Sequence, residues 1–334
     1  MTVQAIIDPQ NPDLYTNVDA IAWSPDGSLL ALGSGFWGVP EGIEDYRVRV
    51  VNVATQQVIF TLPLRDIAQL IWSSSVEELY ICSLVDGILR YQLSTGSLQS
   101  SLPGRDNSKW YSMEHMDLSP DGSRLVAIFT PMGSSYQEFT IYDAQTLQPV
   151  LSDNVNFAYE TETALSWVGY SPDGTLLATT GWDGIVRLWN ATTLSQVAAL
   201  TTSPGQRLES GDWSADGLLA VGNGYMNRCI TVWNISAQQI INRIDLGVGI
   251  YYSLRWHPDG RQIALQGGEV WDSVTGQQVR PAFPNTSAID WSPSGILAYG
   301  VSTDGRLTIP PNDNPLGSLV SLSAVPPLPP SPQT

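Results

Sequence analysis

Short apolar runs alternate with turn residues along most of the chain. Residues 170–190, YSPDGTLLATTGWDGIVRLWN, contain a Pro-Asp-Gly turn, an apolar run, an Asp-Gly turn and a second apolar run. Proline fixes φ and glycine permits positive φ, so both are typical of tight turns. An Asp-Gly pair between two apolar runs is a strong signal for a β-hairpin. The pattern therefore predicts short antiparallel strands.

This segment is one copy of a unit that occurs seven times. The aligned turn residues are Ser24, Ser73, Ser119, Ser171, Ser214, His257 and Ser292, at intervals of 49, 46, 52, 43, 43 and 35 residues. Each copy has the order strand, turn, strand, tight turn, strand and a shorter, more polar strand; the turn of the second copy, WSSSV, is degraded. Four antiparallel strands at this period predict the blades of a β-propeller.

The ends of the predicted third strands carry a second motif, found as Tyr142-Asp143, Trp189-Asn190, Trp233-Asn234 and Trp271-Asp272. Together with the Ser-Pro-Asp-Gly turns, it resembles the WD-repeat β-propeller family over about residues 18–310. The resemblance implies an all-β fold, a single seven-bladed β-propeller of four-stranded antiparallel blades with the ring closed by a terminal strand. Such turns also occur in six-bladed Tol-type propellers, but seven copies favour seven blades.

The chain departs from this family in one respect. The usual Gly-His pair before the first strand is missing, because only His115 and His257 are present. The family's Asp-His-Ser-Trp hydrogen-bond network is therefore not available. We expect the blades to depend more on apolar packing.

The predicted boundaries divide the chain into three parts. Residues 1–17 form an N-terminal segment whose residues Val3–Ile7 supply the closing strand, residues 18–322 form the propeller, and residues 323–334 form a flexible Pro-rich tail. The third strand of the last blade is predicted at Arg306–Ile309. Leu316–Leu322 has the right spacing to supply the outer strand locally, so closure by either terminus stays open, with the N-terminus favoured.

The charge of the chain bears on its partners. The formal net charge is −17, from 32 acidic and 15 basic residues. Phosphate backbones and anionic membrane surfaces would be repelled, which argues against nucleic acid and membranes and favours a basic partner. No uninterrupted apolar stretch approaches 18 residues and no signal-peptide pattern is present, so we expect a soluble, cytoplasmic protein. Cys82 and Cys229 fall in non-adjacent blades and are expected to be buried free thiols.

We find no catalytic motif and expect no cofactor. Residues Gly33–Gly38 match G-x-G-x-x-G, but they begin a hairpin loop and not a helix. The Gly-Lys pair of a phosphate-binding loop and the G-x-S-x-G elbow are both absent. We expect His115 to be packed or hydrogen-bonded, and His257 to replace the turn serine.

One column of acidic residues is a candidate for a channel site. Asp117, Asp212 and Asp290 each stand two residues before the aligned turn residue on the innermost strand, and Arg255 has the equivalent place in the sixth copy. The first interpretation is a polar lining of a water-filled channel. The second is a site for a hard cation, because carboxylates suit such ions. A cation there would support a cation-dependent enzyme or a ligand-binding propeller.

The loops around the predicted channel mouth are rich in aromatic residues with acidic neighbours. Exposed aromatic side chains are typical anchors of protein interfaces. The predicted partner-binding residues are Phe36, Trp37, Trp110, Tyr136, Tyr159, Trp182, Tyr225 and Met226. In the WD-repeat family the residue before the tight-turn aspartate, here Trp182, often contacts partners.

The leading functional prediction is thus a non-enzymatic scaffold that binds a basic or apolar protein or peptide segment on this loop face. A third hypothesis is an assembly module, because Pro326 and Pro329 have the P-x-x-P spacing that other domains recognise. The sequence leaves the oligomeric state open.

Overall fold

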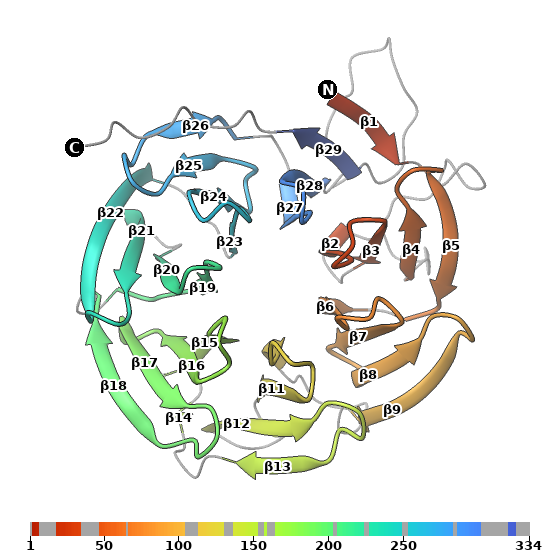
Figure 1. Ribbon diagram of the computed structural model, residues 1–334, viewed down its shortest axis with the longest axis horizontal. Helices are drawn as coiled ribbons and strands as arrows, with labels where there is room; N and C mark the ends of the chain where they lie inside the picture. The colour runs from red at the N-terminus through yellow and green to blue at the C-terminus, as the bar shows by residue number, and fades with distance from the viewer. Residues whose placement is uncertain are drawn as a thin grey trace.

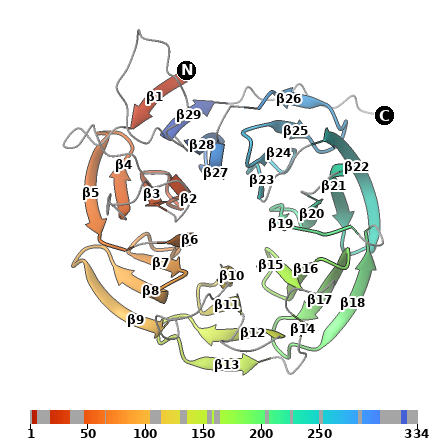
Figure 2. The ribbon, with the colours of Figure 1, turned by 180° about the vertical axis from the view of Figure 1, so that it is seen from behind.

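The strands of the computed structural model are arranged as sheets around a common axis, with the first strand of each unit innermost (Figures 1 and 2). The structure describes residues 2–6, 18–34, 47–64, 66–103, 113–129, 136–152, 157–158, 164–202, 206–223, 227–248, 253–282, 286–301 and 320–324. Over these ranges every regular element is a β-strand, and no helix is long and apolar enough to span a membrane. The fold is therefore an all-β propeller of antiparallel blades.

Six blades consist of strands that are consecutive in the chain. Blade 1 contains β2 (Val18–Trp23), β3 (Leu29–Ser34), β4 (Val48–Asn52) and β5 (Gln57–Leu62), and blade 2 contains β6 (Ile67–Trp72), β7 (Glu78–Ser83), β8 (Gly87–Gln92) and β9 (Ser97–Pro103). Blade 3 contains β10 (Met113–Leu118), β11 (Arg124–Phe129), β12 (Tyr136–Asp143) and β13 (Pro149–Ser152), with β14 (Phe157–Ala158) paired to β12.

The next three blades repeat this plan. Blade 4 contains β15 (Leu165–Tyr170), β16 (Leu176–Gly181), β17 (Ile185–Asn190) and β18 (Gln196–Thr201). Blade 5 contains β19 (Ser210–Trp213), β20 (Leu218–Asn223), β21 (Asn227–Asn234) and β22 (Gln239–Val248). Blade 6 contains β23 (Leu254–Trp256), β24 (Gln262–Leu265), β25 (Val270–Asp272) and β26 (Gln278–Arg280).

The seventh sheet combines both ends of the chain. Its order is β27 (Thr286–Trp291), β28 (Ile296–Val301), β29 (Val320–Ala324) and β1 (Thr2–Ile6), with β1 antiparallel to β29. The strand beside β28 is thus β29. We had predicted residues 306–309 for this position, and those residues lie outside the described ones. The two terminal segments that were treated as alternatives pair with each other in this sheet.

The Ser-Pro-Asp-Gly turns fold through their own side chains. The Ser24 hydroxyl donates to Asp26 Oδ1 at 2.6 Å and accepts the Leu29 amide at 2.9 Å, while Gly27 has a φ of 72°. The same contacts recur at the turn serines of blades 3, 4 and 5. In blade 6, His257 Nδ1 accepts the Asp259 amide at 3.0 Å, so the histidine does take the place of the turn serine.

The Trp-Asn and Tyr-Asp endings have a local explanation as well. Asn190 Oδ1 accepts the Thr193 amide at 2.9 Å, and Asp143 Oδ1 accepts the Thr146 amide at 2.9 Å. An Asn or Asp side chain that accepts an amide further along the chain stabilises a turn. The residue that ends the third strand therefore starts the turn into the fourth.

The apolar core lies between neighbouring sheets and not within one blade. Each of the seven clusters of buried apolar residues takes members from two adjacent sheets, including one between the seventh sheet and blade 1. For example, Phe139 of blade 3 packs on Trp189 of blade 4 with ring centroids 5.2 Å apart. Each blade is therefore stabilised by its neighbours, as expected for a repeat architecture.

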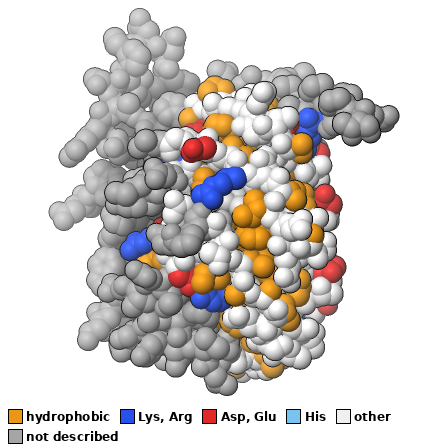
Figure 3. All heavy atoms as spheres, turned by 90° about the vertical axis from the view of Figure 1, so that its left-hand side faces the viewer, with side chains coloured by type: hydrophobic (Ala, Val, Ile, Leu, Met, Phe, Trp, Pro, Cys, Tyr) orange, Lys and Arg blue, Asp and Glu red, His pale blue; other side chains and the backbone are white. Residues whose placement is uncertain are grey.

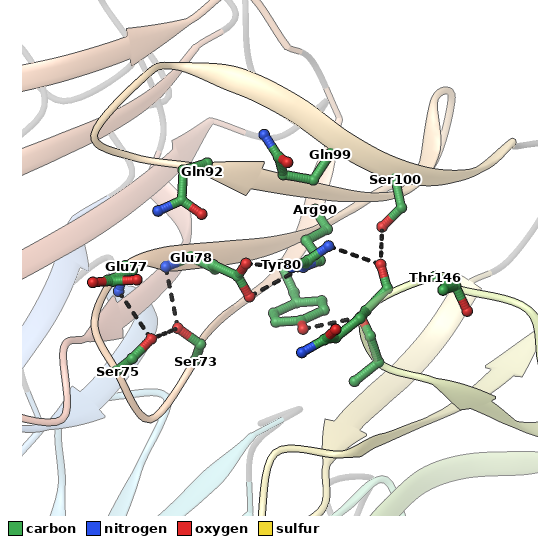
Figure 4. Close-up of polar contacts among 12 residues, drawn as sticks. Ser73, Ser75, Glu77, Glu78, Tyr80, Arg90, Gln92, Gln99, Ser100 and Thr146 are labelled. Carbon is green, nitrogen blue, oxygen red and sulfur yellow. Dashed lines mark hydrogen bonds and ion pairs between the residues drawn. The ribbon is translucent and has the colours of Figure 1, made fainter.

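Polar contacts add to this packing at the seam of blades 2 and 3 (Figure 4). Arg90 forms an ion pair with Glu78 and donates to the Gln145 carbonyl oxygen at 2.8 Å, which also accepts the Ser100 hydroxyl at 2.9 Å. The Tyr80 hydroxyl donates to the Ala144 carbonyl oxygen at 3.0 Å. Side chains of one blade thus bind the backbone of the next.

The outer wall carries scattered apolar side chains. Figure 3 views the side of β18 and β22, where hydrophobic atoms are interspersed with polar ones. Val197, Ile240 and Ile241 are exposed there, and Ile59 is exposed on the equivalent strand of blade 1. Single exposed aliphatic residues are normal on a protein surface and do not by themselves indicate a binding site.

Candidate functional site

The innermost strands line two cavities along the axis. The larger, which we call the turn-side cavity, has a volume of about 560 Å³ and is bordered by the turn prolines Pro25, Pro120 and Pro172. The smaller, the loop-side cavity, has a volume of about 190 Å³ and lies at the opposite ends of these strands, near Asp19. Both cavities are lined by Ile21, Gln69, Leu70, His115, Trp167 and Arg255, which therefore mark the level where they meet.

The three aspartates of the predicted acidic column border the turn-side cavity, and each carboxylate binds the next sheet. Asp117 Oδ2 accepts the Tyr170 amide, Asp212 Oδ2 accepts the Trp256 amide and Asp290 Oδ2 accepts the Trp23 amide, all at 2.7 Å. The donor is in each case the residue that precedes the aligned turn residue of the next copy. The column therefore joins blade 3 to blade 4, blade 5 to blade 6, and the seventh sheet to blade 1.

Tryptophans of the innermost strands form a second set of bonds, which point to the preceding blade. The indole N–H groups of Trp72 and Trp213 donate to the carbonyl oxygens of Ala22 and Gly169, at 3.0 and 3.2 Å. Those of Trp256 and Trp291 donate to the carbonyl oxygens of Asp212 and Arg255, at 3.0 and 3.2 Å. From the sequence we expected the blades to depend more on apolar packing. These bonds leave no signal within one copy of the repeat, because each partner lies in a neighbouring copy.

Burial changes the ionisation of the acidic column. It raises the pKa of Asp117 to about 7, and those of Asp212 and Asp290 to about 6, against the opposing effects of the bound amides and Arg255. Within the described ranges, no three His, Cys, Asp or Glu side chains are placed to hold a metal ion. Each carboxylate instead has a backbone amide as its partner.

His115 and Gln69 lie between the two cavities. The Gln69 side-chain amide donates to the Met116 carbonyl oxygen and accepts the Met116 amide, both at 2.9 Å, so it imitates a strand neighbour. Burial, followed by the positive charge of Arg255, lowers the pKa of His115 to about 3. His115 is therefore neutral at physiological pH, and its ring packs 5.9 Å from that of Trp167.

The loop-side cavity is shaped by β-bulges. The pairing register shifts at Asp19, Ser166 and Ser287, at the start of the first strands of blade 1, blade 4 and the seventh sheet, and all three residues line the cavity. A bulge re-aims a side chain that would otherwise follow the strand alternation. The Ser166 hydroxyl donates to the carbonyl oxygen of Leu208, in the segment before β19, and the Ser287 hydroxyl donates to that of Val18 in blade 1, both at 2.5 Å.

Glu209 also lines this cavity and belongs to a cluster with Trp182 and Arg207. The guanidinium carbon of Arg207 lies 4.0 Å from the Trp182 ring centroid. Burial raises the pKa of Glu209, and the positive charge of Arg207 and the Trp182 side chain oppose this shift. The Leu208 amide, between the arginine and the glutamate, donates to the Gly181 carbonyl oxygen at 3.1 Å. The segment before β19 is thus fixed against the tight turn of blade 4.

The structure places two of the eight predicted partner-binding residues. Trp182 lies in the tight turn before β17 and is described with its side chain, whereas Tyr136 is described only as the first backbone position of β12. The others, Phe36, Trp37, Trp110, Tyr159, Tyr225 and Met226, lie outside the described residues. Sequence reasoning missed Asp19 and Glu209. One signal could have identified Asp19: it stands five residues before the aligned turn residue of its copy, Ser24. Ser166 and Ser287 stand at the same position in their own copies.

Comparisons with known proteins agree with this architecture. A family model described as "WD domain, G-beta repeat" matches residues 159–190, which contain β15, β16 and β17. A solved structure described as "Crystal Structure of Mitotic Checkpoint Complex" is similar to this chain with a TM-score of 0.70 and 17% sequence identity, and the match covers 98% of this chain and 91% of that chain. At this identity the likeness concerns the fold alone.

Proposed function

Because a WD-repeat family model matches residues 159–190 and the fold is a β-propeller, we propose that the chain is a non-enzymatic scaffold that binds a protein or peptide segment at its loop face. By loop face we mean the loop-side cavity with its rim, Trp182, Arg207 and Glu209, and the predicted aromatic loops around it. The observation that carries the proposal is this rim, where an aromatic ring and a carboxylate lie beside a polar cavity. Rigid scaffolds commonly present their binding groups on such loops.

The bonds between sheets support a rigid frame beneath the loop face. The seventh sheet is joined to blade 1 by Asp290 to the Trp23 amide and by Ser287 to the Val18 carbonyl oxygen, the same two contacts that join other blades. We therefore interpret the seventh sheet as a seventh blade that closes the ring. A closed ring would hold the loops in place without any rearrangement on binding.

Charge supports a basic partner segment. The net charge of −17 would attract cationic chains and repel nucleic acid and anionic membranes. The similar solved structure is that of a complex, which fits a protein partner for this fold. The alternative, a cation-dependent site at Asp117, Asp212 and Asp290, has less support because each of these carboxylates is hydrogen-bonded to a backbone amide.

An affinity capture with matched variants tests the proposal. The protein, its Trp37→Ala/Trp182→Ala/Tyr225→Ala variant and an outer-wall control, Ile59→Ser/Val197→Ser, are used as baits in lysate of the source cells, with mass spectrometry as the readout. Binding of a captured protein is then measured with purified components. We expect a partner that binds the wild type and the control and loses at least tenfold in affinity for the triple variant. Equal binding by all three folded baits would overturn the loop-face assignment.

A further inference from the structure

Trp182, Arg207 and Glu209 have the arrangement of a site that recognises a guanidinium group. Arg207 stacks on the indole of Trp182 at 4.0 Å, which is within the range of a cation–π interaction. The carboxylate of Glu209 lies close enough that the positive charge of Arg207 and the Trp182 side chain both lower its pKa against the effect of burial. An aromatic face and a nearby carboxylate are the two groups that a planar guanidinium binds best.

Arg207 differs from the arginines that support the fold. Arg228 is buried in an ion pair with Glu269, and Arg187 is largely buried in an ion pair with Asp183. Arg207 is instead exposed on the segment before β19. An exposed cation–π contact is weak, about 0.5–1 kcal/mol. A competing guanidinium could therefore replace Arg207 at low cost.

The cavity beside this cluster offers room for a side chain that enters from outside. Its volume of about 190 Å³ corresponds to on the order of six water molecules, at roughly 30 Å³ each. Glu209, Ser210 and Ser253 line it, and the buried Ser210 hydroxyl has no hydrogen-bond partner among the described residues. Arg255 lies at the inner end and repels a second cation there. A guanidinium would therefore stay at the rim, near Glu209 and Trp182.

We propose that this rim is an arginine-binding site that Arg207 occupies in the free chain, and that an arginine of the partner segment displaces it. This inference rests on the proposed function, since it names the group of the partner that the loop face recognises. It favours arginine over lysine, because lysine has neither the planar face for stacking nor the forked donors for a carboxylate. Arg207 then acts as an internal competitor that lowers the affinity for the partner.

The test uses N-acetyl-arginine amide as the probe and the indole N–H signals of the ¹⁵N-labelled protein as the readout. The Trp182 signal is assigned by its loss in Trp182→Phe. We expect the probe to shift this signal in the wild type, and to bind about two- to fivefold more tightly to Arg207→Ala, the factor that corresponds to an exposed cation–π contact. Glu209→Gln should lose binding by tenfold or more. Arg124→Ala, which removes a partly exposed arginine of blade 3, should bind as the wild type does.

Two comparisons decide against the inference. If N-acetyl-citrulline amide, which is neutral and similar in shape, shifts the signal equally, the site does not recognise a guanidinium. If Arg207→Ala binds the probe no better than the wild type, Arg207 is not a competitor. Circular dichroism and thermal unfolding verify that each variant is folded.

The two proposals can fail separately. A captured partner that depends on Trp37, Trp182 and Tyr225 but binds Glu209→Gln normally would leave the scaffold standing and overturn the arginine site. Probe binding that follows the expected order, without any partner that depends on the loop face, would support the site and overturn the scaffold.

Discussion

The carboxyl group of Asp117 has two opposing effects on the stability of the ring. Its oxygens accept the Tyr170 amide of the next blade at 2.7 Å and the Leu118 amide at 2.9 Å. Its burial beside the turn-side cavity penalises the charged form and raises its pKa from 3.8 to about 7. Asp117→Asn keeps one acceptor oxygen for the Tyr170 amide and, like the protonated carboxyl, lacks the charge and the second acceptor, whereas Asp117→Ala removes both acceptors and the charge. The two variants therefore separate the hydrogen bond from the charge.

The sign of the pH effect follows from the direction of the shift. Because the pKa in the folded state is higher than in the unfolded state, the folded protein binds more protons between pH 4 and pH 7, and stability falls as pH rises through this window. One pKa unit corresponds to about 1.4 kcal/mol. Since the carboxyl borders a cavity that can hold water, we expect this residue to lower the free energy of unfolding by about 2 kcal/mol between pH 5 and pH 8.

Urea unfolding followed by tryptophan fluorescence at pH 5, 6.5 and 8 measures these effects. Asp117→Asn should be more stable than the wild type by about 2 kcal/mol at pH 8, and its advantage should shrink toward pH 5. Asp117→Ala leaves the buried amide of Tyr170 without its acceptor, at a cost of about 1–3 kcal/mol at every pH. At pH 8 the relief of the charge should offset most of that cost.

The comparison of the two variants can refute this reasoning. If Asp117→Asn shows the same dependence of stability on pH as the wild type, burial of this carboxyl does not set the slope. If Asp117→Ala is as stable as the wild type at pH 5, the bond to blade 4 contributes nothing measurable.

Three further perturbations test the fold. Val76, a β-branched residue at a φ of 63° in the degraded turn of blade 2, is strained, but its side chain also packs on the apolar cluster between blades 1 and 2. Val76→Gly should therefore change stability in thermal unfolding by less than about 1 kcal/mol, because relief of the strain offsets the lost packing, whereas Gly122→Val should destabilise the protein. A Cβ added at Gly169 would lie 2.4 Å from the ring of Trp167, so Gly169→Ala should cost about 1–3 kcal/mol in urea unfolding. Burial raises the pKa of Cys82 to about 12, so a thiol reagent at pH 8 should label it only after unfolding.

Local chemistry explains which features were readable from the sequence. The contacts of Ser24, Asp26 and Leu29 lie within six residues, so the turn and its hairpin could be predicted from one copy of the repeat. That the two cysteines are buried and form no disulfide also followed from their places in the repeat. Asp117 and Tyr170, in contrast, are 53 residues apart and meet only when two blades pack. The acidic column was visible, but its partners were not.

The same limit applies to the ends of the chain and to the loop face. Residues 306–309 were predicted to be the third strand of the last blade, whereas β28 pairs with β29. The spacing of the repeat does not reveal that a segment further along the chain takes the place of the predicted strand. Trp182 was recognised as a candidate from its place before a tight-turn aspartate. Nothing in the repeat indicated that Arg207 covers its ring, since the segment before β19 belongs to no repeated strand.

The distribution of carboxylates along the axis explains why function is expected at one end of the channel. At the turn side, each carboxylate of the acidic column is bound to the amide of the next sheet, so withdrawing it to bind a ligand would leave a buried amide without its acceptor. At the loop side, Glu209 lies near the Trp182 side chain and the exposed Arg207, and an incoming arginine could replace Arg207 without opening a seam between blades. A cationic group can therefore bind at the loop side without weakening the ring, whereas binding at the turn side would compete with the bonds that join the blades.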